Sequence, residues 1–472
     1  MKKTKIICSI GPATQSWEKF KGIADAGMNT ARINFSHATL EERKIDEDLV
    51  KRANEELGTN IAILYDTKGP DLRTCTFDGD YIELVEGSTI RIVEEDLKDK
   101  GNKDQISFNY RNIVKDLKVG MSVLLDDGFY KLVVEEVEDG GASVVCRIIN
   151  GGTIKSRRGV CIPGIKLDIP FVSEEDKDDI QYACEHDGDY LALSFVNSAD
   201  DIQEVKKLCA QFGKPNMKII SKVETQYAMD NLKEIVEMSD YIMIARGDLG
   251  IETGVENLPL YQQMMIDECH LQGKGVIMAT QMMSSMKHNI RPTNAEVTDV
   301  ANAVLQGCDA IMTSDETTMG EYPVETIQKM NEICEKVESY CRFENDSFVN
   351  TEKDITSTIA ESVVTASNDI EAKVIVAATM SGHTARKISN LRPVAPILAT
   401  VPNQKVAREL ALNYGVYPVL VKEYNSTDEV VNDGKEKAIA FAKLNKGDHV
   451  IITGGFPNTG NKITNFMKIE EI

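Results

Sequence analysis

The sequence predicts an α/β fold built on a (β/α)8 barrel, with a small β-barrel domain inserted into it and an α/β domain after it. Short apolar runs followed by helix-like segments recur eight times, which is typical of parallel strands covered by helices. One stretch of about 100 residues interrupts this alternation with a different pattern, and after about Asn345 the pattern restarts. A doubly wound open sheet is the alternative that the pattern leaves open.

The eight runs are short enough to be buried strands, and most of them end in polar residues. In chain order they are 3–10, 30–36, 61–68, 190–196, 217–224, 241–248, 275–283 and 309–316.

The interrupting segment, from about Pro70 to Pro170, has apolar residues in alternation and turn residues between the runs, as in IRIVEED and YKLVVEEVED. Because an insertion in a βα loop lies on the loop-bearing face of a barrel, it can act as a lid there. The domains predicted are the barrel at 1–69 and 170–345, the insert at 70–169 and the C-terminal domain at 346–472.

The bulk composition restricts the classes of partner. The 75 acidic residues outnumber the 53 Lys and Arg residues, giving a formal charge of −22, which argues against nonspecific binding to nucleic acid or to anionic membranes. No apolar stretch approaches the ~18 residues that a membrane span needs, and the N-terminal run is too short for a signal core. Ten scattered cysteines without a C-x-x-C pair indicate reduced thiols. A cytoplasmic protein without membrane or nucleic-acid partners is expected.

Polar side chains follow seven of the eight runs. In a barrel the carboxyl ends of the strands meet on the face that carries catalytic groups. Any one of these residues is more simply explained as a solvated residue at a strand end than as a catalytic residue. A barrel with a purely structural role, however, does not need polar groups at the ends of seven strands. The set is Arg32, Asn34, Ser36, Asp66, Thr67, Lys68, Ser194, Lys222, Glu224, Arg246, Asp248, Thr280, Gln281, Ser314, Asp315 and Glu316.

The types of residue at the strand ends indicate a site that binds an anionic substrate together with metal ions. Glu224 and Asp248, on adjacent strands, are hard oxygen ligands suited to Mg²⁺ or Mn²⁺. The ARGDLG turn is expected to open a helix, whose Gly247 and Asp248 amides could hold a carboxylate. Three cations suit phosphate and developing negative charge: Arg32, Arg73 and Lys222. Neutral oxygens with one carboxylate suit a larger monovalent ion: Asn34, Ser36, Asp66 and Thr67.

Nine motifs in order along the whole chain resemble the pyruvate kinase family. They are TKIICSIGPAT, ARINFSH, DTKGPDLRT, RRGVCIPG, IISKVET, ARGDLGIE, MATQM, RPTNAEVTDVANAV and SDETTMGEYP. The resemblance implies a TIM barrel with a C-terminal regulatory domain, in which phosphoenolpyruvate gives its phosphoryl group to ADP, producing pyruvate and ATP in glycolysis. It also implies Mg²⁺ (or Mn²⁺) and K⁺ as cofactors, a phosphorylated allosteric effector and a homotetramer.

The resemblance further implies a role for individual residues. Lys222 stabilises the transferring phosphoryl group and the enolate, Arg32 binds phosphate, and Glu224 with Asp248 holds the divalent ion. Gly247, Asp248 and Thr280 position the substrate, and Thr280, through water, is the candidate proton donor. The K⁺ ligands are Asn34, Ser36, Asp66 and Thr67, and the nucleotide contacts are Asn34, His37, Arg73 and Arg158.

The turn TMSGHTAR at 379–386 offers hydroxyls and amides at a helix N-terminus, a geometry that suits a phosphate. An ordinary helix-capping turn is the alternative, and the resemblance favours an effector phosphate. The residues concerned are Thr379, Ser381, Gly382, His383 and Thr384.

Several positions depart from the family's pattern: Asp71, Arg158, Cys161, Asn197, Asn294 and Asp315. The Arg158 side chain keeps a positive charge where lysine is more usual. The Asp315 carboxylate could weaken phosphate affinity or point outward, and Asn294 puts the subunit contacts in question. The acidic residue Asp71 favours dependence on K⁺. Two alternatives to a pyruvate kinase are a Mg²⁺-dependent barrel lyase and a metabolite sensor without catalysis; the DTKGP motif, the inserted domain and the intact Lys222, Glu224 and Asp248 set favour the kinase.

Overall fold

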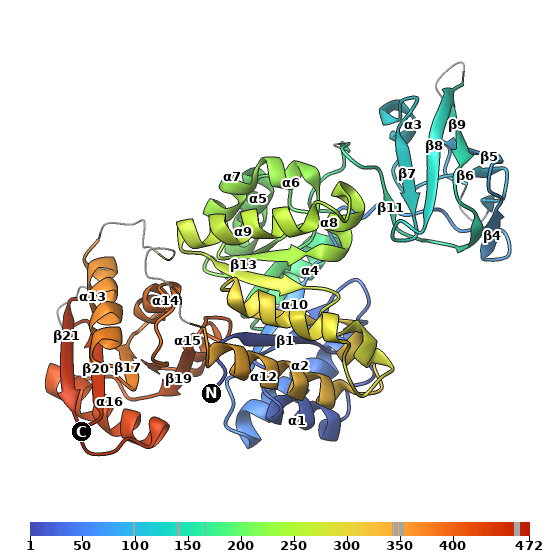
Figure 1. Cartoon of the computed structure of the whole chain (residues 1–472). Coiled ribbons are helices and arrows are strands. Elements are labelled where there is room, and N and C mark those ends of the chain that lie inside the picture. Colours follow the sequence, from blue (N-terminus) through green and yellow to red (C-terminus); the bar gives the residue numbers. More distant parts are fainter. Residues whose placement is uncertain are drawn as a thin grey trace.

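The protein consists of three bodies in a row (Figure 1). A central barrel carries the inserted β domain on one side and the C-terminal α/β domain on the other. The computed structural model describes residues 1–97, 100–138, 142–165, 167–341, 343, 348, 354–456 and 463–472. The predicted boundary at 345/346 lies outside these residues.

Eight parallel strands close into a barrel in the order β1-β16-β15-β14-β13-β12-β3-β2. Every one falls inside a predicted run, so the (β/α)8 prediction is confirmed and the open sheet is excluded. The strands are β1 (Lys5–Ser9), β2 (Thr30–Asn34), β3 (Ala62–Asp66), β12 (Tyr190–Leu193), β13 (Lys218–Val223), β14 (Tyr241–Ala245), β15 (Gly275–Ala279) and β16 (Ala310–Thr313).

Helices surround the barrel, and several begin with reciprocal caps in which an N-cap hydroxyl and an acidic residue three positions later bind each other's amides. Thr39 with Glu42 and Thr293 with Glu296 are two examples. The long helices are α1 (Trp17–Asp25), α2 (Leu40–Glu56), α4 (Glu174–Glu185), α5 (Ala199–Gln211), α9 (Leu258–Gln272), α10 (Asn294–Leu305) and α12 (Pro323–Glu338). Shorter ones are α6 (Gln226–Asp230), α7 (Leu232–Met238), α8 (Arg246–Thr253), η2 (Ser284–Lys287) and α11 (Asp315–Thr318).

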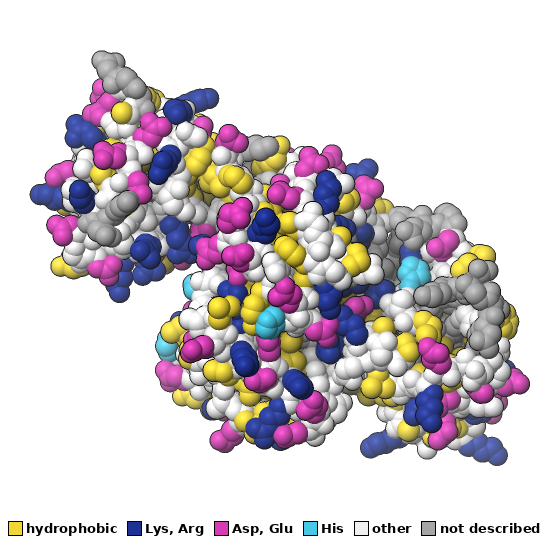
Figure 2. All heavy atoms as spheres, turned by 180° about the vertical axis from the view of Figure 1, so that it is seen from behind, with side chains coloured by type: hydrophobic (Ala, Val, Ile, Leu, Met, Phe, Trp, Pro, Cys, Tyr) yellow, Lys and Arg dark blue, Asp and Glu magenta, His cyan; other side chains and the backbone are white. Residues whose placement is uncertain are grey.

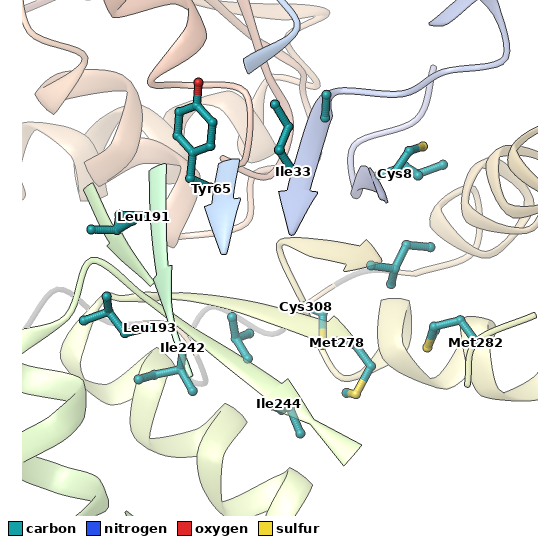
Figure 3. Packing of buried hydrophobic residues seen from close by; sticks show 14 of the residues in the cluster. Cys8, Ile33, Tyr65, Leu191, Leu193, Ile242, Ile244, Met278, Met282 and Cys308 are labelled. Carbon is teal, nitrogen blue, oxygen red and sulfur yellow. The ribbon is translucent and has the colours of Figure 1, made fainter. Parts of the chain in front are cut away.

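The barrel strands are mainly apolar because both of their faces are buried. On β14, Tyr241 and Met243 pack in the barrel interior, whereas Ile242 and Ile244 pack against the helices (Figure 3). This alternation follows from the two-residue period of a strand. The polar residues that line the cavity lie in or just after the carboxyl-terminal halves of the strands, as Lys222 does on β13.

The inserted domain is built mainly of strands, as predicted, but it also contains one short helix that was not predicted. Its six-stranded sheet has the order β11-β7-β8-β9-β5-β6. The segment at 73–77 joins the two edges of that sheet, because Arg73 bridges Gly159 beside β11 and Thr74 bridges Phe108 beyond β6. The elements are β4 (Tyr81–Leu84), β5 (Thr89–Val93), β6 (Gln105–Ile106), α3 (Ile113–Asp116), β7 (Ser122–Leu125), β8 (Tyr130–Val137), β9 (Ser143–Ile148), β10 (Gly152–Lys155) and β11 (Val160–Cys161).

The C-terminal domain is a five-stranded sheet in the order β19-β18-β17-β20-β21, in which only β21 is antiparallel to its neighbour. Helices from this domain pack on the sheet (Figure 1). The elements are α13 (Ile355–Asp369), β17 (Val374–Ala378), α14 (His383–Asn390), β18 (Ile397–Val401), α15 (Gln404–Arg408), β19 (Val416–Leu420), α16 (Thr427–Ala442), β20 (His449–Gly454) and β21 (Phe466–Glu471).

The C-terminal domain seals the amino end of the barrel. Leu412 is fully buried in the cluster that fills the barrel interior. Two buried barrel carboxylates bind cations of the C-terminal domain: Asp309, before β16, binds Arg392 at 2.7 Å, and Asp189, before β12, binds Arg408 at 2.9 Å. The functional groups at the carboxyl ends of the strands therefore lie at the other end of the barrel.

Candidate active site

A cavity of about 680 Å³ lies at the carboxyl ends of the barrel strands. The barrel contributes Lys222 and Asp248 to its lining, and the inserted domain contributes Arg73 and Arg158. The inserted domain therefore faces the strand ends where the sequence predicted a site.

The ammonium group of Lys222 lies among three oxygen-bearing side chains at the edge of this cavity. Lys222 Nζ donates to Ser194 Oγ at 2.7 Å and lies 3.1 Å from Glu224 Oε1 and 3.4 Å from Asp66 Oδ1. Burial disfavours the ammonium charge, but the Asp66 and Glu224 carboxylates outweigh it and raise the pKa of Lys222. A permanent positive charge is thus held at the cavity wall.

Glu224 is almost completely buried beside this ammonium. Its Oε2 accepts a hydrogen bond of 2.6 Å from the backbone amide of Phe195. Burial raises the pKa of Glu224 to about 7; Lys222 opposes the shift and the negative charge of Asp248 adds to it. The charge of Asp248 thus reaches Glu224 across one cavity, and two neighbouring carboxylates form a site that favours a cation.

Arg32, the third of the five residues of β2, is oriented by two partners. Its Nε donates to Asp66 Oδ2 at 2.7 Å and its Nη1 donates to Ser9 Oγ at 2.8 Å. Burial disfavours a charge on Asp66, but Lys222 and Arg32 lower the pKa of that carboxyl. Arg32 lines the cavity, so a guanidinium and an ammonium face the same space.

The residues of ARGDLG form the first turn of α8, as predicted. Arg246 turns away from the cavity: its Nη1 binds the Asp299 carboxylate at 2.7 Å and its Nη2 donates to the Thr280 carbonyl at 2.5 Å. Thr280 has a φ of +66°, a backbone conformation that β-branched residues rarely adopt. Its hydroxyl accepts from the Gly247 amide at 3.0 Å. Arg246 and Gly247 therefore hold the end of β15 against the start of α8.

The four predicted K⁺ ligands lie on neighbouring strand ends, because Asn34 of β2 pairs in register with Asp66 of β3. Asn34 Oδ1 accepts from the Ser36 amide at 3.1 Å. The Thr67 carbonyl accepts from the Ser194 hydroxyl at 2.7 Å. Asn34, Ser36 and Thr67 thus line the cavity, and Asp66 lies on the strand next to Asn34.

The predicted nucleotide residues line the cavity as well. Arg73 is held by Asp71 at 2.5 Å, and Arg158 lies 3.5 Å from Asp126. Burial raises the pKa of Asp71, although Arg73 opposes the shift. His37 lines the cavity from the barrel side and is exposed.

Two departures from the family's pattern have clear surroundings at the cavity. The Cys161 thiol donates to Glu252 Oε2 on α8 at 3.0 Å, which joins the inserted domain to the barrel. The Asn197 Oδ1 accepts from the Thr225 hydroxyl at 2.5 Å.

Two further departures are exposed. The Asp315 carboxylate binds Lys287 at 2.8 Å and is largely exposed, and Asp315 also lines the cavity. Asn294 is the exposed first residue of α10.

Most of the predicted site residues therefore meet at one cavity, whereas Asp66, Gly247 and Thr280 lie directly behind its wall. Within the described ranges, no cluster of three or more His, Cys, Asp or Glu side chains could hold a metal ion by itself.

Sequence reasoning gave no role to Asp126, Asp127, Glu252 and Asp299, although the first three line the cavity. The DDG triplet after the apolar run MSVLL could have drawn attention to Asp126 and Asp127, because Asp and Gly are typical of turns. In the structure both aspartates have positive φ values.

Comparisons with known proteins agree with this geometry. The family description "Pyruvate kinase, barrel domain" matches residues 1–327, and "Pyruvate kinase, alpha/beta domain" matches residues 357–470. The chain belongs to the pyruvate kinase family. It is 39% identical to a pyruvate kinase of Clostridium acetobutylicum over 477 residues, covering all of both chains. It is 40% identical to one from Bacillus licheniformis, covering 99% of this chain and 80% of the relative.

A solved structure supports the same conclusion. The crystal structure of a pyruvate kinase from Cryptosporidium parvum superposes with a TM-score of 0.93 and 34% identity, covering 100% of this chain and 96% of the other. The chain is thus a phosphotransferase of glycolysis that makes pyruvate and ATP from phosphoenolpyruvate and ADP. The lyase and the sensor without catalysis are set aside. No helix within the described ranges has both the length and the apolar character to cross a membrane.

Proposed function

We propose that the pyruvate kinase reaction takes place in the cavity between barrel and insert, with Lys222 as the group that stabilises the transferring phosphoryl. The observation that carries this proposal is the position of its ammonium, buried between Asp66, Glu224 and Ser194 at the cavity wall. The bond from the enol oxygen to phosphorus breaks while a bond from phosphorus to the terminal ADP oxygen forms. Such a transfer needs mainly alignment and neutralisation of charge, which Lys222 and Arg32 supply.

Glu224 and Asp248 are proposed to hold Mg²⁺ or Mn²⁺. The donor set fits, because Glu224 and Asp248 place two carboxylates in one cavity, and hard oxygen ligands favour a hard cation. When bound, the ion supplies positive charge to the oxygens of substrate and phosphoryl group. Since the protein offers two carboxylates, water and substrate would complete the ligand sphere.

Asn34, Ser36, Asp66 and Thr67 are proposed to hold K⁺. Arg32 and Lys222 already neutralise much of the Asp66 charge, so the group as a whole offers mainly neutral oxygens. Such a group suits a monovalent ion better than a divalent one. When bound, this ion adds one positive charge beside the phosphoryl site.

The substrate carboxylate is proposed to lie at the start of α8, near Gly247, Asp248 and Thr280. The N-terminal end of a helix attracts an anion, and Asp248 brings this end to the cavity. The Thr280 hydroxyl now donates to the Ala279 carbonyl at 2.7 Å. It would have to turn, or act through water, to deliver a proton to the enolate carbon.

ADP is proposed to bind between the barrel and the insert, where Asn34, His37, Arg73 and Arg158 line the cavity. The Arg158 Nε lies 3.5 Å from Asp126 Oδ1 but makes no hydrogen bond, so this guanidinium can still donate to a phosphate oxygen. Closure of the insert would exclude water, which otherwise accepts the phosphoryl group.

The turn before α14 is proposed as a phosphate-binding effector site. Gly382 caps this helix with a φ of +78° and no side-chain cap. Thr384 pairs with Thr464 at 2.6 Å, and Thr379 is buried beside it. Ser381 and His383 are exposed at the same turn. An effector phosphate would find hydroxyls and a helix N-terminus there.

A homotetramer is proposed from the family together with the surface of α9. Three exposed apolar residues, Leu260, Met264 and Leu271, recur at helical spacing on one side of that helix. Figure 2 shows hydrophobic groups among mixed charges on the face seen from behind. An apolar helix side of this kind is suited to packing on a second copy of the chain.

A cytoplasmic location is also proposed, since all ten cysteines are free thiols. The domain boundaries at 69/70, 169/170 and 345/346 stay predictions.

The central proposal is tested by Lys222→Met in a coupled assay that follows pyruvate, with Mg²⁺ and K⁺ present. Turnover is expected to fall by about 10³-fold or more while affinity for phosphoenolpyruvate stays largely intact. Lys218→Met is the matched control, because Lys218 begins the same strand and binds Asp240 at 3.0 Å instead. A loss of affinity alone would assign Lys222 to substrate binding.

A further inference from the structure

Ser194, the first residue after β12, makes the shortest contact to the Lys222 ammonium in the described structure. Its Oγ accepts from Lys222 Nζ at 2.7 Å, whereas the Glu224 and Asp66 oxygens lie 3.1 and 3.4 Å away. Ser194 also donates its own hydroxyl hydrogen to the Thr67 carbonyl at 2.7 Å. Because that hydrogen is committed to Thr67, a lone pair of the hydroxyl oxygen is left for the ammonium.

The backbone around Ser194 is closely packed and includes a residue with a positive φ. Gly69 packs so closely that a Cβ there would lie 2.6 Å from the Ser194 carbonyl oxygen. The next residue, Phe195, has a φ of +56°, which is strained for a bulky side chain and persists only where the surroundings impose it. Its amide donates to Glu224. One turn thus holds both Lys222 and Glu224.

We propose that Ser194 is a positioning residue that fixes the direction of the Lys222 ammonium at the cavity wall, because its hydroxyl takes one hydrogen bond from an ammonium that also contacts the carboxylates of Asp66 and Glu224. Ser194 acts through Lys222 in this proposal and contributes no group to the transfer itself. A preorganised charge stabilises a transition state better than one that must first leave another partner. The inference rests on the proposed role of Lys222.

A purely structural role, in which Ser194 only satisfies the Thr67 carbonyl, makes a different prediction. A structural loss would lower stability and would be independent of Lys222. A positioning loss would lower kcat, leave KM almost unchanged and disappear when Lys222 is absent, because residues that act through one another are not additive.

The experiment compares Ser194→Ala with Ser221→Ala. Ser221 is an equally buried serine beside Lys222 on β13, but its hydroxyl binds Ser239 at 2.7 Å. Ser194→Ala is expected to lower kcat by about 10-fold to 100-fold, with KM for phosphoenolpyruvate within about twofold of wild type. Ser221→Ala is expected to keep wild-type kcat. Ser194→Cys, which preserves volume but is a weak acceptor, should reproduce the loss if the alanine variant folds poorly, and Ser194→Thr should recover much of it.

Ser194→Ala made in a Lys222→Met background distinguishes the positioning role of Ser194 from a purely structural one. There, Ser194→Ala should cost less than about twofold in the residual turnover, measured at high enzyme concentration. Equal losses in both backgrounds, or wild-type kcat in both the alanine and cysteine variants, would overturn the inference while leaving the role of Lys222 intact. Wild-type turnover of Lys222→Met itself would instead remove the proposed role of Lys222.

Discussion

The guanidinium of Arg246 binds both carboxylate oxygens of Asp299, at 2.8 and 2.7 Å, and at the same time donates to the Thr280 carbonyl. Three elements, α8, α10 and the end of β15, meet at this one side chain. The buried strand β14 is therefore followed by the charged Arg246 because this side chain links α10 and the end of β15 to the start of α8. Asp248, two residues later, lines the cavity.

This relationship predicts that Asp299→Asn will impair catalysis from outside the cavity. Without the carboxylate charge, Arg246 is held less firmly and the strained turn at Thr280 can relax. The expected result is a fall in kcat/KM of about 10-fold to 100-fold, measured by steady-state kinetics. Asp179→Asn is the control, because it breaks a buried ion pair with Arg43 that lies outside the cavity lining; it should lower the melting temperature and spare kcat/KM. Equal kinetics in the two variants would contradict the prediction.

The predicted K⁺ site makes activity depend on the monovalent cation. Replacing K⁺ by tetramethylammonium at constant ionic strength should lower kcat strongly, by about 10-fold or more, because one positive charge is lost beside the phosphoryl site. The coupled pyruvate assay measures this directly. Activity that is indifferent to the exchange would refute the assignment of Asn34, Ser36, Asp66 and Thr67.

The contact between Cys161 and Glu252 predicts an effect on lid closure. Glu252 also accepts from the Gly164 amide at 3.0 Å, so it binds two points of the segment that leads out of the inserted domain. Glu252→Gln removes the charge that both donors face and should raise KM for ADP severalfold while changing KM for phosphoenolpyruvate less. Glu256→Gln, an exposed change shortly after α8, is the control. Unchanged ADP kinetics in Glu252→Gln would show that this contact has no part in nucleotide binding.

Asp46 on α2 predicts a pH effect on stability that is separate from catalysis. Burial raises the pKa of Asp46 to about 7; a hydrogen bond from Gln15 opposes the shift, and Glu42 and Glu47 add to it. Between the ordinary carboxyl pKa near 4 and this value, the folded state binds a proton that the unfolded state has lost. The free energy of unfolding should therefore fall as pH rises from about 4 to about 7, by about 1.4 kcal/mol for each unit of pKa shift.

Asp46→Asn should remove this dependence. The variant is expected to melt at a higher temperature than wild type at pH 8, with the difference shrinking towards pH 4, as measured by thermal unfolding at several pH values. Asp48→Asn, an exposed change on the same helix, should leave the pH profile as it is. Parallel profiles for wild type and Asp46→Asn would contradict the raised pKa.

The barrel and its site residues could be predicted from local patterns. Runs such as YIMIA are apolar on both faces and end abruptly in charge, so their burial and the location of the site follow from the order of residues alone. Lys222, Glu224 and Asp248 were predicted to lie together because their strands are neighbours in the predicted barrel, and all three line the cavity.

The sequence by itself determined the eight-stranded barrel, the mainly β insert and the set of polar groups at the strand ends, because these depend on periodicity over short distances. Only the tertiary structure decided that Arg246 binds Asp299, that Asp315 binds Lys287 and that Ser194 lies against Lys222. Those partners are separated by 53, 28 and 28 positions in the chain. Their meeting depends on how strands and helices pack, which no local pattern encodes.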